Sequence, residues 1–166
     1  IWIIAGPTAS GKTNLGIEVA KVFKTEIINF DSRQLYQEMN IGVARPSEEE
    51  LTQIKHLLIG SHSITAPINA QSFRELALAC LNDIVSRTES AVLVGGTGLY
   101  LKALLHGFDI LPKTSTETRE KMELKYQSHG LEGLLQDIHH IDPLASNHFD
   151  VQNIARVKRI WEILNE

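Results

Sequence analysis

The sequence lacks the features of a secreted, membrane-spanning or strongly basic protein. It has one cysteine, Cys80, which cannot form an internal disulfide, so we expect a reducing, cytoplasmic environment. Its apolar runs are short and broken by Gly, Lys or Glu. None approaches the about 20 apolar residues that cross a bilayer, and we expect no membrane partner. The 16 Lys and Arg against 20 Asp and Glu give a formal charge of -4, so any nucleic acid must be bound by a local basic patch.

The overall composition is typical of a globular protein. Hydrophobic residues make up 43% of the 166 residues and charged residues 22%, which suits one compact domain with a small appendage. The chain begins at Ile1 inside an apolar run and stops at Glu166 inside an amphipathic pattern. We therefore expect a piece of a longer protein, and we expect it to be monomeric.

Strand-like and helix-like segments alternate along the first two thirds of the chain. Short apolar runs predict strands at 1–5, 26–30, 57–59 and 91–94, and helical periodicity predicts helices at 12–23, 72–84 and 98–105. The alternation predicts an α/β fold, a P-loop NTPase-like and mostly parallel sheet flanked by helices, with residues 1–5 buried on both faces. The loops 6–13, 31–36 and 95–98 then lie at the carboxyl edge of the sheet, where ligands bind.

Helix-start signals divide the rest of the chain. Ser47 precedes three acidic residues, and capping boxes are expected at Ser72 with Glu75 and at Thr114 with Glu117. Gly130 ends the helix that follows Thr114, and a second short helix and a final one come after it. We expect residues 1–112 and 145–166 to form the α/β core and residues 113–144 to form a small helical insertion.

A phosphate-binding loop lies between the first strand and the first helix. The residues Gly6-Pro7-Thr8-Ala9-Ser10-Gly11-Lys12-Thr13 have its pattern of Gly, four residues, Gly, Lys and Ser or Thr. Main-chain N–H groups of such a loop bind phosphate oxygens, Lys12 adds a positive charge, and the Thr13 hydroxyl ligates Mg²⁺. The alternative is a glycine turn with a surface lysine, but the strand and helix around the loop favour a nucleotide-binding or diphosphate-binding site.

The acidic residue nearest this loop favours group transfer. A motor-type ATPase needs an acid after a later apolar strand, and here Gly95 follows residues 91–94. The first acidic residue at a strand end is Asp31, in the position of a substrate-facing carboxylate in small kinases. Asp31 also suits a helix N-cap, so the residue alone leaves both roles open.

Five motifs in order give a specific resemblance. They are 6–13, 31–36 (Asp-Ser-Arg-Gln-Leu-Tyr), 41–47 (Ile-Gly-Val-Ala-Arg-Pro-Ser), 94–104, and a final block with Asp150, Asn153, Arg156, Arg159 and Glu162 spaced by threes. Together they cover nearly all of the chain, which resembles the tRNA dimethylallyltransferase (isopentenyltransferase) family. The resemblance implies a tRNA-modifying transferase that moves a dimethylallyl group from dimethylallyl diphosphate to the exocyclic amine of adenosine 37, with Mg²⁺ assisting. Its substrates would be tRNAs that read codons beginning with U, and diphosphate would be released.

The resemblance also implies roles for single residues. Asp31 would be the general base, Thr97 would contact the reacting end of the substrates, and Lys12 would stabilise the leaving diphosphate. The tRNA anticodon stem-loop would be contacted by Asp31, Ser32, Arg33, Gln34, Thr97, Arg119, Arg156 and Arg159. Gln34 has both a donor and an acceptor for an adenine edge.

Several alternatives stay open on the residues alone. Thr97 also suits a helix cap, and Arg156 and Arg159 also suit a solvated helix face paired with Glu162. The family continues beyond the position of Glu166, so inactivity of this chain by itself is one expectation. Other functions compatible with the motifs are a small-molecule P-loop kinase, an adenylate isopentenyltransferase, and a non-catalytic nucleotide-binding module.

Overall fold

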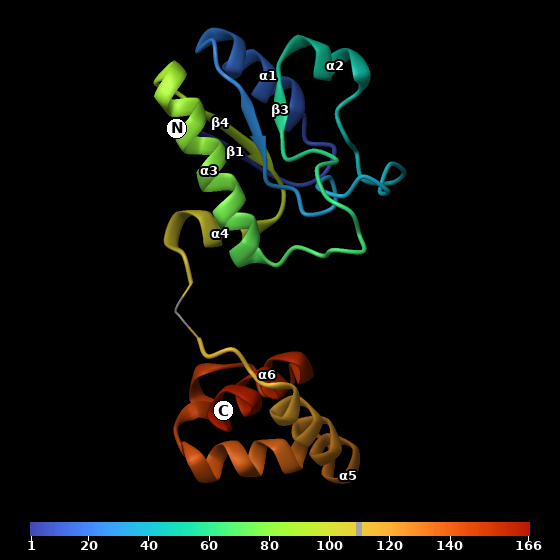
Figure 1. Ribbon diagram of the computed structural model, residues 1–166, viewed down its shortest axis with the longest axis vertical. Coiled ribbons are helices and arrows are strands. Elements are labelled where there is room, and N and C mark those ends of the chain that lie inside the picture. The colour runs from blue at the N-terminus through green and yellow to red at the C-terminus, as the bar shows by residue number, and fades with distance from the viewer. Residues whose placement is uncertain (109–110) are drawn as a thin grey trace. The chain divides into compact units, whose positions relative to one another are not determined.

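The computed structural model describes residues 1–108 and 111–166, which form two compact units, Ile1–Phe108 and Asp109–Glu166 (Figure 1). Residues 109–110, which the expected core segment 1–112 includes, lie outside the described residues. The first unit contains β1 (Trp2–Ala5), α1 (Lys12–Val22), β2 (Ile27–Asn29), α2 (Glu48–Gln53), β3 (His56–Leu57), α3 (Ala70–Thr88), β4 (Val92–Gly95) and α4 (Gly98–His106).

The sheet of the first unit is parallel, in the strand order β1-β4-β2-β3. This confirms the predicted α/β class, because parallel neighbours require the helical crossovers seen between them. The expectation that residues 1–5 are buried on both faces is wrong. β1 lies at an edge of the described sheet, where Trp2 is 48% exposed and Ile3 39% exposed. Trp2 stacks on Phe23, just after α1, with ring centroids 4.8 Å apart.

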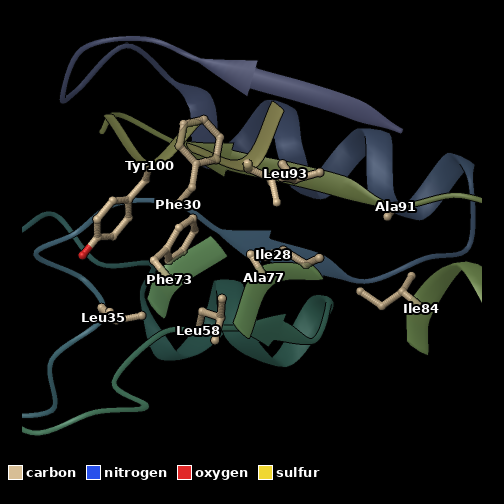
Figure 2. Close-up of a cluster of buried hydrophobic side chains, with 11 residues drawn as sticks. Ile28, Phe30, Leu35, Leu58, Phe73, Ala77, Ile84, Ala91, Leu93 and Tyr100 are labelled. Carbon is tan, nitrogen blue, oxygen red and sulfur yellow. The ribbon is translucent and has the colours of Figure 1, made fainter. Parts of the chain in front are cut away.

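The two faces of the sheet contact different helices, as alternation along the strands requires. Ile28 and Leu93 pack against α3 and α4 in a cluster that includes Phe30, Phe73 and Tyr100 (Figure 2). The rings of Phe73 and Tyr100 stack at 4.1 Å between centroids. The neighbouring residues Ile27 and Val92 pack instead against Ile17 and Ala20 of α1. Both central strands are therefore covered on both faces.

Gly16 sets the approach of α1 to the sheet. A Cβ atom built on Gly16 would lie 2.5 Å from Cγ2 of Val94 on β4, far inside van der Waals contact. The glycine therefore lets α1 lie close to β4, and this fixes where the phosphate-binding loop meets the strand ends.

The second unit is helical. It contains α5 (Thr116–Ile141), a short 3₁₀ helix (Ala145–His148) and α6 (Ile154–Leu164). α5 has non-helical dihedral angles at Gly130 (φ 64°, ψ -162°), so the break expected there is present. Val157 and Trp161 of α6 are buried with Met122, Leu134 and Ile138 of α5.

This packing differs from the expected division, in which residues 145–166 belonged to the α/β core. The apolar stripe of α6 is buried against both halves of α5, so residues 145–166 group with the helices of the second unit. No helix among residues 1–108 and 111–166 is long and apolar enough to span a membrane.

The helix caps were predicted with mixed success. Ser47 caps α2 in a capping box with Glu50, as its acidic first turn indicated. The box expected at Ser72 is wrong, because Asn69 caps α3 and accepts from the Ser72 N–H at 2.9 Å. The box expected at Thr114 is also wrong: Ser115 caps α5, and its side chain accepts from the Thr118 N–H at 3.1 Å.

Candidate functional site

The phosphate-binding loop and Asp31 line one cavity of about 240 Å³ within the first unit. The loop forms one wall, and the ends of β2 and β4, the 43–46 segment, α2 and β3 form the others. The lining residues are Thr8, Ala9, Ser10, Gly11, Lys12, Thr13, Asn14, Asn29, Asp31, Gln34, Val43, Ala44, Pro46, Glu50, His56, Ile59, Val94 and Gly95.

Two residues of the phosphate-binding loop have left-handed backbone dihedral angles. Gly11 is the N-cap residue of α1 and adopts a left-handed conformation (φ 80°, ψ 10°), and Ala9 also has a positive φ of 62°. The Lys12 ammonium donates a hydrogen bond across the loop to the Pro7 carbonyl. Lys12 and Thr13 therefore occupy the first turn of a helix whose N-terminus opens on the cavity, an arrangement that suits a bound anion.

Asp31 is fixed by a buried asparagine just before it. The Asn29 side chain accepts from the Asp31 N–H at 3.1 Å and donates to the Leu58 carbonyl at 2.9 Å. One carboxylate oxygen of Asp31 accepts from the Arg33 N–H at 3.0 Å and closes a tight turn. Asp31 therefore stabilises a turn rather than the N-terminus of a helix, and it lines the same cavity as the loop.

Gly96 keeps the space between the loop and Asp31 open. A Cβ atom at Gly96 would lie 3.2 Å from the Gly6 carbonyl oxygen and 3.5 Å from Oδ2 of Asp31. The start of the phosphate-binding loop, the turn after β2 and the turn after β4 therefore meet at this glycine.

Thr97 contacts the Asp31 turn instead of capping its own helix. Although Thr97 is the N-cap residue of α4, its side chain makes no capping hydrogen bond. Its hydroxyl accepts from the Ser32 N–H at 2.9 Å and donates to the Ser32 hydroxyl at 3.1 Å. The residue lies beside the cavity, bonded to the neighbour of Asp31, and is not itself among the lining residues.

Gln34 lines the cavity, and the nitrogen of its side-chain amide is hydrogen-bonded within the protein. Its Nε2 donates to the main-chain carbonyls of Ala44 at 2.9 Å and Val43 at 3.3 Å. The expected donor to an adenine edge is therefore engaged with the protein main chain. Arg33 is exposed next to it.

Sequence reasoning missed four polar residues of the cavity, Asn14, Asn29, Glu50 and His56. Asn29 could have been found, since it is a polar residue at the end of an otherwise apolar strand. His56 donates from Nδ1 to the Ile54 carbonyl at 2.8 Å, because a carbonyl can only accept. Burial lowers the pKa of His56, and this outweighs the opposing effects of that hydrogen bond and of the nearby Glu50 carboxylate. The expected strand began at Leu57, and only the pairing of His56 with Ile27 of β2 shows that His56 belongs to β3.

The three predicted tRNA-contacting arginines of the second unit differ in their surroundings. Arg119 and Arg159 both donate to the Thr114 hydroxyl, at 3.2 Å and 2.8 Å. Arg159 also pairs with Glu162 at 3.1 Å and donates to the Pro112 carbonyl. The pairing with Glu162 that was the alternative to tRNA contact is therefore present. Arg156 is exposed, and its guanidinium forms no hydrogen bond or ion pair with the part of the chain that the structure describes.

A family model and the curated relatives that match this chain all describe the same kind of transferase. A family model described as IPP transferase matches residues 34–166. A tRNA dimethylallyltransferase of Chlorobium phaeobacteroides is 40% identical over 164 residues, which are 99% of this chain and 51% of that protein. One of Cytophaga hutchinsonii is 37% identical over 166 residues, which are 100% of this chain and 55% of that protein. The chain thus spans about half the length of the curated relatives it matches.

Solved structures agree in fold. The full-length tRNA isopentenylpyrophosphate transferase of Bacillus halodurans is 34% identical, with a TM-score of 0.64, over 98% of this chain and 54% of that chain. A eukaryotic dimethylallyltransferase acting on tRNA has a TM-score of 0.82 over 98% of this chain and 40% of that chain. At 24% identity, this second likeness bears on the fold alone.

Proposed function

The chain belongs to the IPP transferase family, and on that premise we propose that the whole protein transfers a dimethylallyl group from dimethylallyl diphosphate to the exocyclic amine of adenosine 37 in tRNA. One observation carries the proposal: the phosphate-binding loop and the Asp31 carboxylate line the same cavity. A diphosphate bound at the loop would direct its allylic carbon into the space that Asp31 also faces.

The phosphate-binding loop would hold the leaving group. Lys12 and the main-chain N–H groups at the start of α1 would stabilise the charge that develops as the allylic carbon–oxygen bond breaks. Single preorganised donors of this kind contribute about 3–4 kcal/mol to such a transition state. The diphosphate leaves intact with the electron pair of the broken bond.

The residues present also fit a Mg²⁺ ion. The hydroxyl of Thr13 and the carboxylate of Asp31 line one cavity, and oxygen ligands of this kind suit Mg²⁺ together with substrate phosphates. When bound, the ion would neutralise negative charge on the diphosphate oxygens. We propose Thr13 as its protein ligand.

Asp31 would act on the attacking amine. As the adenine nitrogen forms its bond to the allylic carbon, the nitrogen loses a proton, and the Asp31 carboxylate would accept it. Asn29 and the turn to Arg33 hold this carboxylate in place before substrate binds. Thr97 would hold the same turn through Ser32, next to the bond that breaks.

The tRNA would be bound by residues of both units. Ser32, Arg33 and Gln34 adjoin the proposed base, and Arg119, Arg156 and Arg159 supply positive charge in the second unit. These contacts are proposals that rest on the family motifs and, for Arg33, Arg119 and Arg156, on the exposure of the side chains.

The test is transfer by the full-length protein to an anticodon stem-loop in the presence of dimethylallyl diphosphate and Mg²⁺. Mass spectrometry of the nucleosides should find isopentenyladenosine. Asp31→Asn is the matched variant, because an amide oxygen can still accept from the Arg33 N–H, so the turn is kept. We expect stem-loop affinity to stay and the transfer rate to fall about 10²- to 10⁴-fold. An undiminished transfer rate in Asp31→Asn would show that Asp31 is not the general base.

Two parallel reactions separate the other functions. Replacing the stem-loop by AMP tests an adenylate isopentenyltransferase. Supplying ATP with a metabolite pool tests a kinase, because only a kinase transfers a phosphoryl group.

A further inference from the structure

The orientation of the Gln34 amide is determined by two carbonyl groups. Its Nε2 donates to Ala44 and Val43, and a primary amide has only two N–H donors. Turning the amide over would bring Oε1 against both carbonyl oxygens, so hydrogen bonding selects one orientation. All three residues line the cavity. The nitrogen of Gln34 is therefore occupied by the protein itself.

The other amide atom remains available. Within residues 1–108 and 111–166, Oε1 of Gln34 accepts no hydrogen bond. A carbonyl oxygen attracts a donor and repels another acceptor. If Oε1 faces the cavity that Gln34 lines, it would favour a purine with an amine at C6, as in adenine, over a purine with a carbonyl there. An adenine amine has two hydrogens, one for the Asp31 carboxylate and one for Gln34.

This selection depends on the segment that carries the two carbonyls. Gly42 has φ 75°, and Ala44 has φ 47°, a left-handed conformation that is strained for a residue with a Cβ atom. Such a backbone persists only where its surroundings determine it. The next residue, Arg45, supplies the anchor: Nη1 donates to Oδ1 of Asn40 at 2.6 Å, and Nη2 donates to the Tyr36 carbonyl.

Arg45 also packs against the chain that holds Gln34. A Cβ atom at Gly60 would lie 3.4 Å from Nη1 of Arg45, so the guanidinium lies directly on this glycine. The Gly60 N–H in turn donates to the Gln34 main-chain carbonyl at 2.9 Å. The Nε of Arg45 is buried without a hydrogen-bond partner in the described residues, a cost that the Nη contacts must offset. The planar fork of arginine links two partners that a lysine could not bridge together.

We propose that Arg45 is a positioning residue for base selection: it holds the 41–45 segment so that Gln34 presents only its carbonyl oxygen to the acceptor base. The inference rests on the proposed function, since it requires a purine in the cavity. Arg45 itself touches the 36–40 segment and Gly60 and is not among the residues that line the cavity.

The experiment compares two stem-loops with the full-length protein, one with adenosine and one with inosine at the acceptor position. Dissociation constants are measured with Mg²⁺ and inorganic pyrophosphate, so that no transfer occurs. We expect the wild type to prefer adenosine by about tenfold or more. Gln34→Leu and Arg45→Met should reduce this ratio to near one, and Arg45→Lys should reduce it in part. Lys21→Met, which removes an exposed cation that contacts Glu18 and Gln53, should leave the ratio unchanged.

The two dissociation constants separate a role in base selection from a structural role of Arg45. The inference is overturned if the wild type binds the adenosine and inosine stem-loops equally well, or if Arg45→Met leaves the ratio of the two dissociation constants unchanged. In either case, transfer by the wild type would still support the proposed function. Equal losses of affinity for both stem-loops would reduce Arg45 to a structural residue. If Arg45→Met does not fold, Asn40→Ala removes one of the two anchors and should lower the same ratio. Absence of transfer by the wild type would instead count against the proposed function.

Discussion

The Thr97 hydroxyl joins the turn after β4 to the turn after β2, accepting from the Ser32 N–H at 2.9 Å. It also donates to the Ser32 hydroxyl at 3.1 Å, so one side chain makes two contacts with the neighbour of Asp31. The two turns come from adjacent strands of the sheet. The proposed base is therefore held from the next strand as well as from its own.

Removal of the Thr97 hydroxyl should slow transfer. Thr97→Val keeps the shape of the side chain but leaves the Ser32 N–H without its partner, which costs about 1–3 kcal/mol. We expect the kcat of the full-length protein to fall tenfold or more, while Thr97→Ser, which keeps the hydroxyl, stays near the wild type. Single-turnover kinetics measure both. Equal rates for the Val and Ser variants would show that the link to Ser32 does not matter.

The contact between Gly16 and Val94 leads to a prediction about stability. Gly16→Ala alone should lower the free energy of unfolding by about 1–3 kcal/mol, because its Cβ would lie 2.5 Å from Val94 Cγ2. In a Val94→Ala background that methyl group is absent, and alanine is favoured over glycine inside a helix by about 1 kcal/mol. Gly16→Ala should then stabilise the chain.

Urea denaturation of the four proteins in this double-mutant cycle measures the coupling. A destabilising effect of Gly16→Ala in both backgrounds would show that the close approach of α1 to β4 is not what makes glycine necessary.

The order of elements in the first unit could be predicted because each signal was local. The apolar runs, the phosphate-loop pattern and the helical periodicity each lie within about a dozen residues. The position of β1 could not be predicted in the same way. An apolar run such as residues 1–5 is equally compatible with a central strand and with the exposed edge strand that is observed.

Errors in the helix caps have a similar cause. Ser72 and Thr114 have the right spacing to acidic residues, but Asn69 and Ser115 are equally good caps nearby. Thr114 instead binds Arg119 and Arg159, which lie in two different helices. For the site, Asp31 and the loop were predicted from motifs, whereas His56 and the engaged amide of Gln34 depend on contacts between distant segments.

Asp137 links the two halves of α5 to α6, and its charge should make the second unit sensitive to acid. It pairs with Lys125 at 3.0 Å and accepts from Trp161 Nε1 at 2.9 Å. Burial raises the pKa of Asp137, but these contacts outweigh it and bring the net pKa below the ordinary value. Stability from such a group is complete above the unfolded-state pKa of about 3.9 and is lost as pH falls through the folded-state pKa.

We therefore expect the unfolding free energy of the second unit to fall below about pH 4, and Asp137→Asn to remove part of that dependence. At pH 7 the variant should lose about 1 kcal/mol, because the ion pair is partly exposed. Trp161 fluorescence reports on this unit once Trp2 is replaced by Phe. An identical pH profile for Asp137→Asn would contradict the proposed link.

Arg156 and Arg159 lie three residues apart on α6, yet their substitution should have different effects. Arg159 holds Thr114, Pro112 and Glu162, so Arg159→Ala should cost about 1 kcal/mol of stability as well as affinity. Arg156 has no such contacts in the described residues, so Arg156→Ala should leave the urea midpoint unchanged. If Arg156 contacts a tRNA phosphate in the full-length protein, its loss should weaken stem-loop binding and reduce the slope of log K against log salt by about one. Lys121→Ala, which removes an exposed charge paired with Glu117, is the control for net charge. An equal change of slope in that control would show that Arg156 acts only through net charge.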